Sequence, residues 1–318
     1  MTRPLGDTEP TLDIRNPLAL HRCLSSTLPG LWRAEWWIWW NRRSPGGRAR
    51  RPLHFPIPAY RFSNFRSTQE LVIVLRAMQF SKTLFDTLPT EDDLARLLSI
   101  NDEVETRVRA NYSDEEIARR AVGGWVGHKE LLIYTLLRHH PVDLVVETGV
   151  AQGVSSWVIL AALEANGRGA LISVDLPNRD PRGYVYNAAG DRDAVFTKDG
   201  LEPGWLVPQE LRSRWDLRIG PAQTILPTLD VRPELFLHDS LHTYDQMAFE
   251  LRWAWNRTPV GGFVGADDIG WNRAFQDFVA DHRGEITLLC NYGVGMVRRV
   301  ARNPRDGRSD RRGEPGPG

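Results

Sequence analysis

Short apolar runs alternate with longer segments of helical periodicity between about residues 121 and 300. The apolar runs predict five buried strands: VDLVVETG (142–149), ALISVD (170–175), DLRIG (216–220), ELFLHD (234–239) and GGFVGADD (261–268). The helical patterns lie before and between them: HKELLIYTLLRHH (128–140), VSSWVILAALEAN (154–166), YDQMAFELRWAW (244–255) and WNRAFQDFVADH (271–282). Strands that alternate with helices predict an α/β fold, with a mostly parallel sheet covered on both faces.

The alternation of strands and helices ends with two apolar segments that are joined by a short turn. EITLLC and GMVRRV flank the turn residues Asn291, Tyr292 and Gly293, which is typical of a β-hairpin. A hairpin requires an antiparallel strand at this end of an otherwise parallel sheet. A plain dinucleotide-binding fold does not predict that strand.

The first 120 residues are irregular, contain prolines and then become helical. Segments 71–80, 90–98 and 113–121 favour helices, with Thr90 and Ser113 as N-caps. We therefore expect a helical and irregular N-terminal segment over 1–120, which covers the substrate or forms an oligomer contact. A catalytic domain over 121–300 and a disordered tail over 301–318 would follow it.

Five tryptophans and Ile38 crowd the segment 31–43 (LWRAEWWIWWNRR), and arginines flank them. The tryptophans from Trp32 to Trp40 are too dense for one helix face. Such a segment suits contact with a membrane surface or with a second copy of the chain in a homo-oligomer. The simpler alternative is a helix packed on both sides within its own domain.

Composition excludes several classes of protein. The 40 Lys and Arg residues balance 40 Asp and Glu residues, so the net charge gives no reason to expect a nucleic-acid partner. Cys23 and Cys290 lie far apart and lack metal-ligand spacing, which indicates a reducing compartment. Neither a signal peptide nor an apolar run of about 20 residues is visible, so we expect a cytoplasmic protein without a transmembrane span.

The segment 147–156 (ETGVAQGVSS) joins the first predicted strand to a helix, where open α/β sheets bind their ligands. Gly149 allows a tight turn and Gly153 a close approach of the backbone to a ligand. The spacing G-x-x-x-G differs from the dinucleotide pattern G-x-G-x-x-G, and no Walker lysine is present. Glu147 is a poor neighbour for a pyrophosphate but suits the cationic S-adenosylmethionine. Asp175, which ends the next strand, can accept hydrogen bonds from ribose hydroxyls.

Acidic residues also follow the fourth and fifth predicted strands. Asp239 follows the fourth strand, with His242 three residues further on, and Asp267 and Asp268 follow the fifth. Adjacent carboxylates repel one another and are best tolerated when solvated or bound to a cation. Asp239, Asp267 and Asp268 offer the hard oxygen ligands that Mg²⁺ prefers. A solvated acidic rim, or a helix N-cap formed by Asp268, is the alternative.

Five motifs in this order resemble those of class I S-adenosylmethionine-dependent methyltransferases. The motifs are VVETGVAQGVSS, LISVDLP, GWLVPQELRSRWDLRIG, LFLHDSLHTYD and GGFVGADDIGW. The resemblance covers about residues 125–300. It is nearest to the group that includes macrolide-sugar O-methyltransferases and cephalosporin-pathway methylation proteins. It implies a Rossmann-like sheet of seven strands, mostly parallel with a reversed last strand, and O-methylation of a hydroxyl on a sugar or another small molecule.

The resemblance also implies roles for single residues. The cofactor would contact these positions: Glu147, Gly149, Ala151, Gly153, Ser155, Asp175, Ala222 and Gln223. Metal-dependent relatives would hold Mg²⁺ with the equivalents of Asp239, Asp267 and Asp268. As a hypothesis of mechanism, the catalytic residues are His242 and Asp239, with His242 or one metal-bound carboxylate as the general base. The chain departs from the family pattern at Pro221 and at Ser240–Leu241.

Two other functions stay open at the level of sequence. An NAD-dependent oxidoreductase would share the first strand, its turn and Asp175, but the dinucleotide glycine pattern is missing. A non-catalytic binding or assembly protein could retain the fold, and the tryptophan-rich segment and the family departures favour it. Calorimetry with each cofactor, and a search for turnover, would separate the three.

Overall fold

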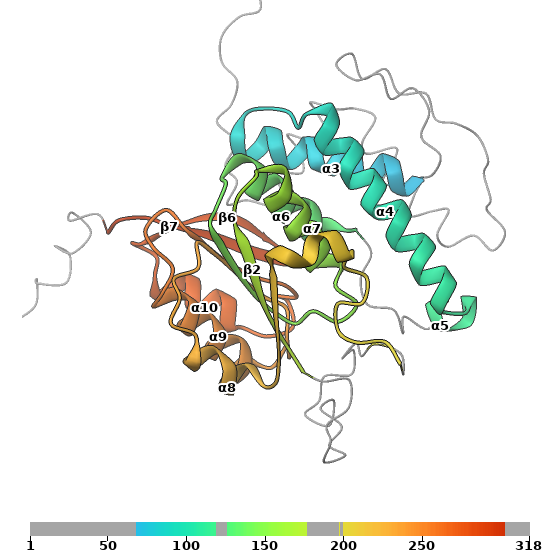
Figure 1. Cartoon of the computed structure of the whole chain (residues 1–318). Helices are drawn as coiled ribbons and strands as arrows, with labels where there is room; N and C mark the ends of the chain where they lie inside the picture. Colours follow the sequence, from blue (N-terminus) through green and yellow to red (C-terminus); the bar gives the residue numbers. More distant parts are fainter. Residues whose placement is uncertain (1–67, 119–125, 177–196, 198–199, 303–318) are drawn as a thin grey trace, which may run out of the picture.

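The computed structural model describes residues 68–118, 126–176, 197 and 200–302. The fold is a seven-stranded sheet with helices on both faces (Figure 1). The strands in chain order are β1 (Leu144–Thr148), β2 (Ala170–Asp175), β3 (Trp215–Ile219), β4 (Leu235–His238), β5 (Phe263–Ala266), β6 (Ile286–Tyr292) and β7 (Val294–Arg299).

The order of the strands across the sheet is β3-β2-β1-β4-β5-β7-β6. Strands β1 to β5 pair in parallel, whereas β7 runs antiparallel to both β5 and β6. The expected closing hairpin is present, and Gly293 turns it with a φ of 68°. The prediction of a mostly parallel sheet with a reversed last strand is therefore confirmed.

Two layers of helices cover the sheet because successive strand residues point to opposite faces. Helices α6 (His128–His139) and α7 (Val154–Ala165) lie on one face, where Val145, Leu235 and Leu237 share a core with them. The other face carries α8 (Ala222–Ile225), α9 (Tyr244–Trp255) and α10 (Ala274–Asp281), which pack against Val146 and Phe236 (Figure 1). The carboxyl ends of β1, β2, β4 and β5 thus share one edge of the sheet.

The helices α3 (Thr68–Phe85) and α4 (Glu91–Asn111) form a further layer outside α6 and α7 (Figure 1). Leu97 and Val104 of α4 are fully buried in the same core as α6 and α7. Thr90 caps α4 with the reciprocal bonds of a capping box, as the sequence predicts. Ser113 and Glu116 make the equivalent pair of bonds at α5 (Asp114–Ala118).

Some expectations fall outside the described residues. The tryptophan-rich segment from Trp32 to Trp40 and the tail over 303–318 are among them. The division into a segment over 1–120 and a domain over 121–300 stays a prediction, although α3 and α4 share a core with the sheet's own helices.

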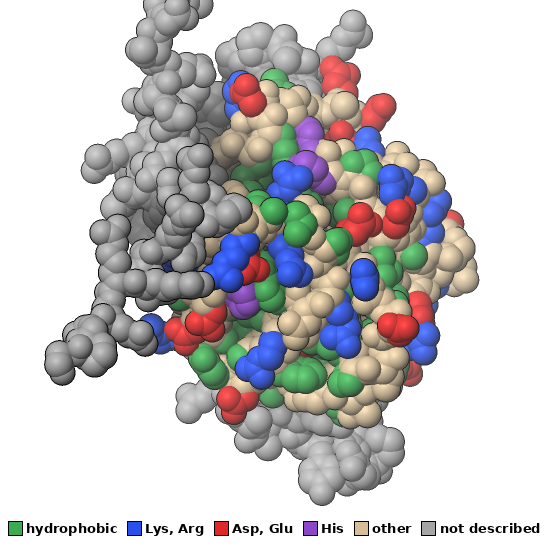
Figure 2. Space-filling view, turned by 90° about the vertical axis from the view of Figure 1, so that its left-hand side faces the viewer, with side chains coloured by type: hydrophobic (Ala, Val, Ile, Leu, Met, Phe, Trp, Pro, Cys, Tyr) green, Lys and Arg blue, Asp and Glu red, His purple; other side chains and the backbone are tan. Residues whose placement is uncertain are grey.

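Two surface properties bear on partners. None of the helices in the described ranges combines the length and the hydrophobicity needed to cross a bilayer. Figure 2 shows acidic, basic and hydrophobic side chains interspersed over the described part of the face that it presents.

The shared core predicts that α4 unfolds together with the sheet. We expect Leu97→Ala, which empties a fully buried position, to lower the free energy of unfolding by about 2 to 5 kcal/mol. The transition followed by urea denaturation should stay single. Leu88→Ala, at a position 41% exposed, is the control and should change stability little. A Leu97→Ala protein that loses helix content in a separate early transition would contradict the shared core.

Candidate active site

The loop between β1 and α7 forms one wall of the site. Its backbone has positive φ at Gly149 (82°), Ala151 (46°) and Gly153 (93°). A Cβ on Gly149 would lie 2.0 Å from the carbonyl oxygen of Asp239, and one on Gly153 would lie 2.7 Å from the Cα of Gly204. The loop consequently packs directly against the end of β4 and against the segment around Gly204, which only glycine at these positions permits.

Glu147 is fully buried beneath this loop, on the face that α7 covers. Its carboxylate accepts hydrogen bonds from Ser155 (3.2 Å), Ser173 (2.7 Å) and Ser156. Burial raises the pKa of Glu147 to about 7, although the three hydroxyl donors act in the opposite direction. The expected cofactor residues Glu147 and Ser155 are therefore hydrogen-bonded to each other inside the loop.

Asp175 lies at the end of β2, on the opposite side of the same loop. Its Oδ2 accepts hydrogen bonds from the amides of Val150 (3.0 Å) and Ala151 (2.8 Å). Burial raises its pKa, and the backbone amide donors oppose that rise. The amide of Gly220 bonds to the carbonyl of Asp175 at 2.8 Å, which places the segment with Ala222 beside Asp175.

The segment predicted to contact adenine begins a short helix. Ala222 is the first residue of α8 and is buried, and Pro221 is its N-cap. The side chain of Gln223 hydrogen-bonds to Gln246 of α9. The structure thus brings this segment next to Asp175, whereas the Gln223 amide has a partner on a neighbouring helix.

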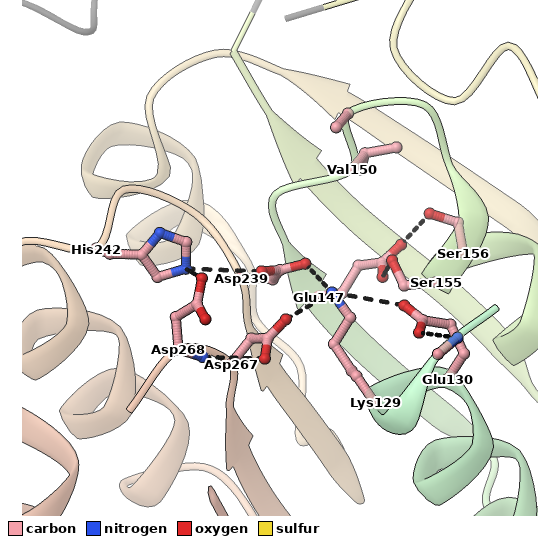
Figure 3. A network of polar contacts seen from close by, with 12 residues as sticks. Lys129, Glu130, Glu147, Val150, Ser155, Ser156, Asp239, His242, Asp267 and Asp268 are labelled. Carbon is pink, nitrogen blue, oxygen red and sulfur yellow. Dashed lines mark hydrogen bonds and ion pairs between the residues drawn. The ribbon is translucent and has the colours of Figure 1, made fainter. Parts of the chain in front are cut away.

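Asp239 and Asp267 each lie one residue beyond a strand, on the face that α6 covers. Figure 3 shows their carboxylates pointing at the ammonium of Lys129, from the first turn of α6. The ammonium hydrogen-bonds to Asp239 Oδ2 and lies 2.9 Å from Asp267 Oδ2. Burial alone would lower the pKa of Lys129, but Asp239, Asp267 and Glu130 raise it well above the usual value. Burial would raise the pKa of Asp239, and Lys129 and His242 outweigh it, so that the pKa is lowered.

His242 lies in the loop after β4, with its ring between two carboxylates (Figure 3). Its Nε2 is 3.7 Å from Asp239 Oδ1 and 3.8 Å from Asp268 Oδ2. The side-chain amide of Asn272 donates to the carbonyl of His242 at 3.1 Å and fixes the loop. The ring of Trp271 lies against the imidazole, with centroids 5.2 Å apart.

Asp268 has a φ of 50°, in the left-handed region that a non-glycine residue rarely adopts. Burial and then the charge of Asp267 raise its pKa. The alternative that Asp268 caps the next helix is wrong, because α10 begins at Ala274 and its N-cap is Arg273. The loop from 267 to 273 makes its own turn instead, with the Trp271 amide bonded to the carbonyl of Asp268.

The three carboxylates are the right ligands for Mg²⁺ in kind but not in arrangement. Asp239 Oδ2 and Asp267 Oδ2 both face Lys129, and Asp268 faces His242. Within the described residues, no group of three or more acidic, histidine or cysteine side chains is arranged to hold a metal ion. As arranged here, the carboxylates do not fit a divalent metal.

Sequence reasoning singled out His242 and the carboxylates but missed Lys129. The signal was a lysine in the first turn of the predicted helix 128–140, where the helix dipole disfavours a cation. Sequence reasoning also missed Gln152, which is fully buried and accepts hydrogen bonds from Tyr112 (3.1 Å) and from the indole of Trp205. His238 is fully buried, as its place in the strand predicts, and its Nδ1 lies 2.5 Å from Glu250 Oε2.

The close contact at Gly149 can be tested against a glycine that shares its backbone conformation. The Cβ added by Gly149→Ala would be strained by the positive φ and would also clash with the carbonyl of Asp239. The Cβ added by Gly167→Ala would lie in open space, so that only the strain of its φ of 69° remains. We expect Gly167→Ala to cost about 1 to 3 kcal/mol in urea unfolding, and Gly149→Ala to cost clearly more. Equal losses would show that the loop does not need the close approach.

The raised pKa of Glu147 predicts a pH dependence of stability. The unfolded chain releases this proton near pH 4.5, while the folded protein retains it until about pH 7. The contribution of Glu147 is therefore fully present below pH 4.5 and is lost as pH rises to about 7, by about 3 kcal/mol. The stability difference between the wild type and Glu147→Gln, measured by urea unfolding at each pH, should change by this amount. A constant difference across this range would contradict the raised pKa.

Comparison with known proteins agrees with this geometry. Residues 146–269, from β1 to the loop after β5, match the family described as a methyltransferase domain. No curated protein matches the chain significantly.

Solved structures of methyltransferases are similar to this chain at low identity. The O-methyltransferase NovP is 16% identical, with 66% of this chain and 100% of NovP covered and a TM-score of 0.47. The S-adenosylhomocysteine-bound methyltransferase PaMTH1 from Podospora anserina is 15% identical, with coverages of 68% and 99% and a TM-score of 0.43. TomG from Streptomyces achromogenes, an O-methyltransferase in complex with S-adenosylmethionine, is 15% identical, with coverages of 64% and 99% and a TM-score of 0.41.

Likenesses at these identities and scores carry no argument about the acceptor or the chemistry of this chain. Residues 146–269 match a methyltransferase domain, and the sheet around them has the strand order and the reversed β7 that the sequence predicts.

Proposed function

We propose that this protein transfers a methyl group from S-adenosylmethionine to a hydroxyl oxygen of a small-molecule acceptor. The observation that carries the proposal is the position of His242, whose Nε2 lies between Asp239 and Asp268. Asp239 in turn contacts the cofactor loop at Gly149. A group able to take a proton therefore lies directly beside the loop expected to hold the methyl donor.

The cofactor would bind along the carboxyl ends of β1, β2 and β3. In this proposal Gly149, Ala151 and Gly153 present the backbone of the loop, and Asp175 faces the ribose. The contacts of Asp175 with the amides of Val150 and Ala151 support its place at the loop. Ala222 and Gln223 would contact the adenine, while Glu147 and Ser155 would shape the loop from beneath.

The reaction is a displacement at carbon. S-adenosylmethionine, when bound, supplies an electrophilic methyl group on its sulfonium sulfur and leaves as S-adenosylhomocysteine. The C–S bond breaks as the C–O bond to the acceptor forms, and the hydroxyl proton passes to the imidazole of His242. Asp239 and Asp268 favour the imidazolium that results, because each places a carboxylate within 4 Å of Nε2.

Assistance by Mg²⁺ held by Asp239, Asp267 and Asp268 stays a prediction of the family resemblance. The ammonium of Lys129 already faces the first two of these carboxylates. The proposed reaction therefore involves no step at a metal ion.

Exposed aromatic rings beside His242 support an acceptor that carries a ring, such as a sugar. Trp271 lies against the imidazole and is 46% exposed, and Tyr244 begins α9 nearby and is 47% exposed. Flat aromatic faces of this kind can pack against the apolar face of a ring. The sugar acceptor, a homo-oligomer and a cytoplasmic location stay predictions.

Replacing His242 with alanine tests the proposal. We expect the turnover number to fall by about 10² to 10⁴, the usual contribution of a general base. S-adenosylhomocysteine affinity, measured by calorimetry, should stay within twofold, because the ring lies beyond the cofactor loop. His140→Ala, at the C-cap of α6, is the control and should keep both properties.

Three outcomes would contradict the proposal in whole or in part. Full turnover by His242→Ala would remove the base from the mechanism. Binding of S-adenosylhomocysteine by the wild type without turnover on any hydroxylated acceptor would favour a non-catalytic binding protein. Heat from NAD but none from S-adenosylhomocysteine would favour an oxidoreductase.

A further inference from the structure

Lys129 places its ammonium between the carboxylates of Asp239 and Asp267, two of the three acids expected to bind Mg²⁺. Its side chain is only 14% exposed, and those of Asp239 and Asp267 are 20% exposed. The ammonium has carboxylate oxygens on three sides: it bonds to Asp239, lies 2.9 Å from Asp267 and 3.6 Å from Glu130. Figure 3 shows Lys129 reaching from α6 across to the ends of β4 and β5.

The position of Lys129 on its helix is unfavourable without these partners. It is the second residue of α6, whose N-terminal end carries a partial positive charge and disfavours a cation. Burial of an ammonium costs free energy as well unless carboxylates pair with it. Two half-buried carboxylates from β4 and β5 supply that pairing, so the lysine and the acids depend on one another.

The same geometry leaves no room for a divalent ion at this place. Mg²⁺ requires carboxylate oxygens at about 2.0 to 2.1 Å in near-octahedral geometry. The two oxygens that would bind it from Asp239 and Asp267 face Lys129 Nζ, and a dication next to the ammonium would be strongly repelled. Asp268, the third expected ligand, points toward His242 and its side chain is 44% exposed.

Lys129 also connects to the proposed base through one carboxylate. Asp239 uses Oδ2 for the ammonium and presents Oδ1 at 3.7 Å from His242 Nε2. Among the described residues, Lys129 and His242 are the only basic side chains within ion-pair distance of Asp239, Asp267 or Asp268. The lysine therefore fixes the orientation of the carboxylate that faces the imidazole.

We infer that Lys129 supplies, from within the chain, the positive charge that a divalent metal supplies in metal-dependent relatives. The protein would then need no metal ion, and Lys129 acts as a positioning residue that holds Asp239 in place for His242. The positioning role rests on the proposed function, whereas the exclusion of the metal can be measured without turnover.

Binding of Mn²⁺, followed by electron paramagnetic resonance and calorimetry on the full-length chain, tests this inference. We expect the wild type, saturated with S-adenosylhomocysteine, to bind no Mn²⁺ below millimolar concentration. Lys129→Met should bind it at least tenfold more tightly, because the variant frees the carboxylates without adding charge. Lys129→Arg should resemble the wild type. Lys82→Met is the matched control at an exposed lysine on α3 and should also resemble the wild type.

A second variant guards against misfolding of Lys129→Met, which leaves two carboxylates unpaired. Lys129→Met/Asp267→Asn lowers that repulsion, and we expect it to fold and to bind Mn²⁺ more tightly than the wild type. Micromolar Mn²⁺ binding by the wild type that Asp267→Asn abolishes would overturn the inference. Wild-type turnover that is lost in a chelator and restored by Mg²⁺ would overturn it too. S-adenosylhomocysteine binding, measured in the same samples, reports separately on the proposed function.

Discussion

The backbone of Gly149 passes so close to the carbonyl of Asp239 that no side chain fits between them. This contact joins the turn after β1 to the end of β4, and the parallel pairing of the two strands fixes its register. Because the strands are neighbours, the loop that would hold the methyl donor and the loop that carries His242 form one continuous surface. The arrangement of the whole site follows from this single approach of two main chains.

Alternation along the strands then decides which side chains meet. Leu237 and Asp239 point to the face of α6 and α7, whereas Phe236 and His238 point to the face of α9. Asp267 falls on the same face as Asp239. A lysine near the start of α6 can therefore reach both carboxylates, and the histidine inside β4 pairs with Glu250 on the other side. The two charged clusters of the site are kept apart by the sheet itself.

The sequence was sufficient for the elements whose signals are local. Apolar runs identify β1, β2, β4 and β5, and Thr90 identifies the start of α4 because a cap and its partner lie three residues apart. The acids at strand ends could be placed near one another because parallel strands end at a common edge. Lys129, Gln152 and the partner of Gln223 could not be found in this way. Each depends on a contact between segments that are distant along the chain. The local sequence around such a side chain does not indicate which distant residue will contact it.

Gln152 gives the loop a connection beyond the sheet. Its amide oxygen receives both the hydroxyl of Tyr112, which ends α4, and the indole of Trp205, in the segment that follows Gly204. Three distant stretches of chain thus share one acceptor atom. If binding at the loop stabilises the end of α4 through these bonds, then stabilising α4 strengthens that binding by the same free energy. Through Gln152, the outer helical layer is therefore hydrogen-bonded directly to the loop between β1 and α7.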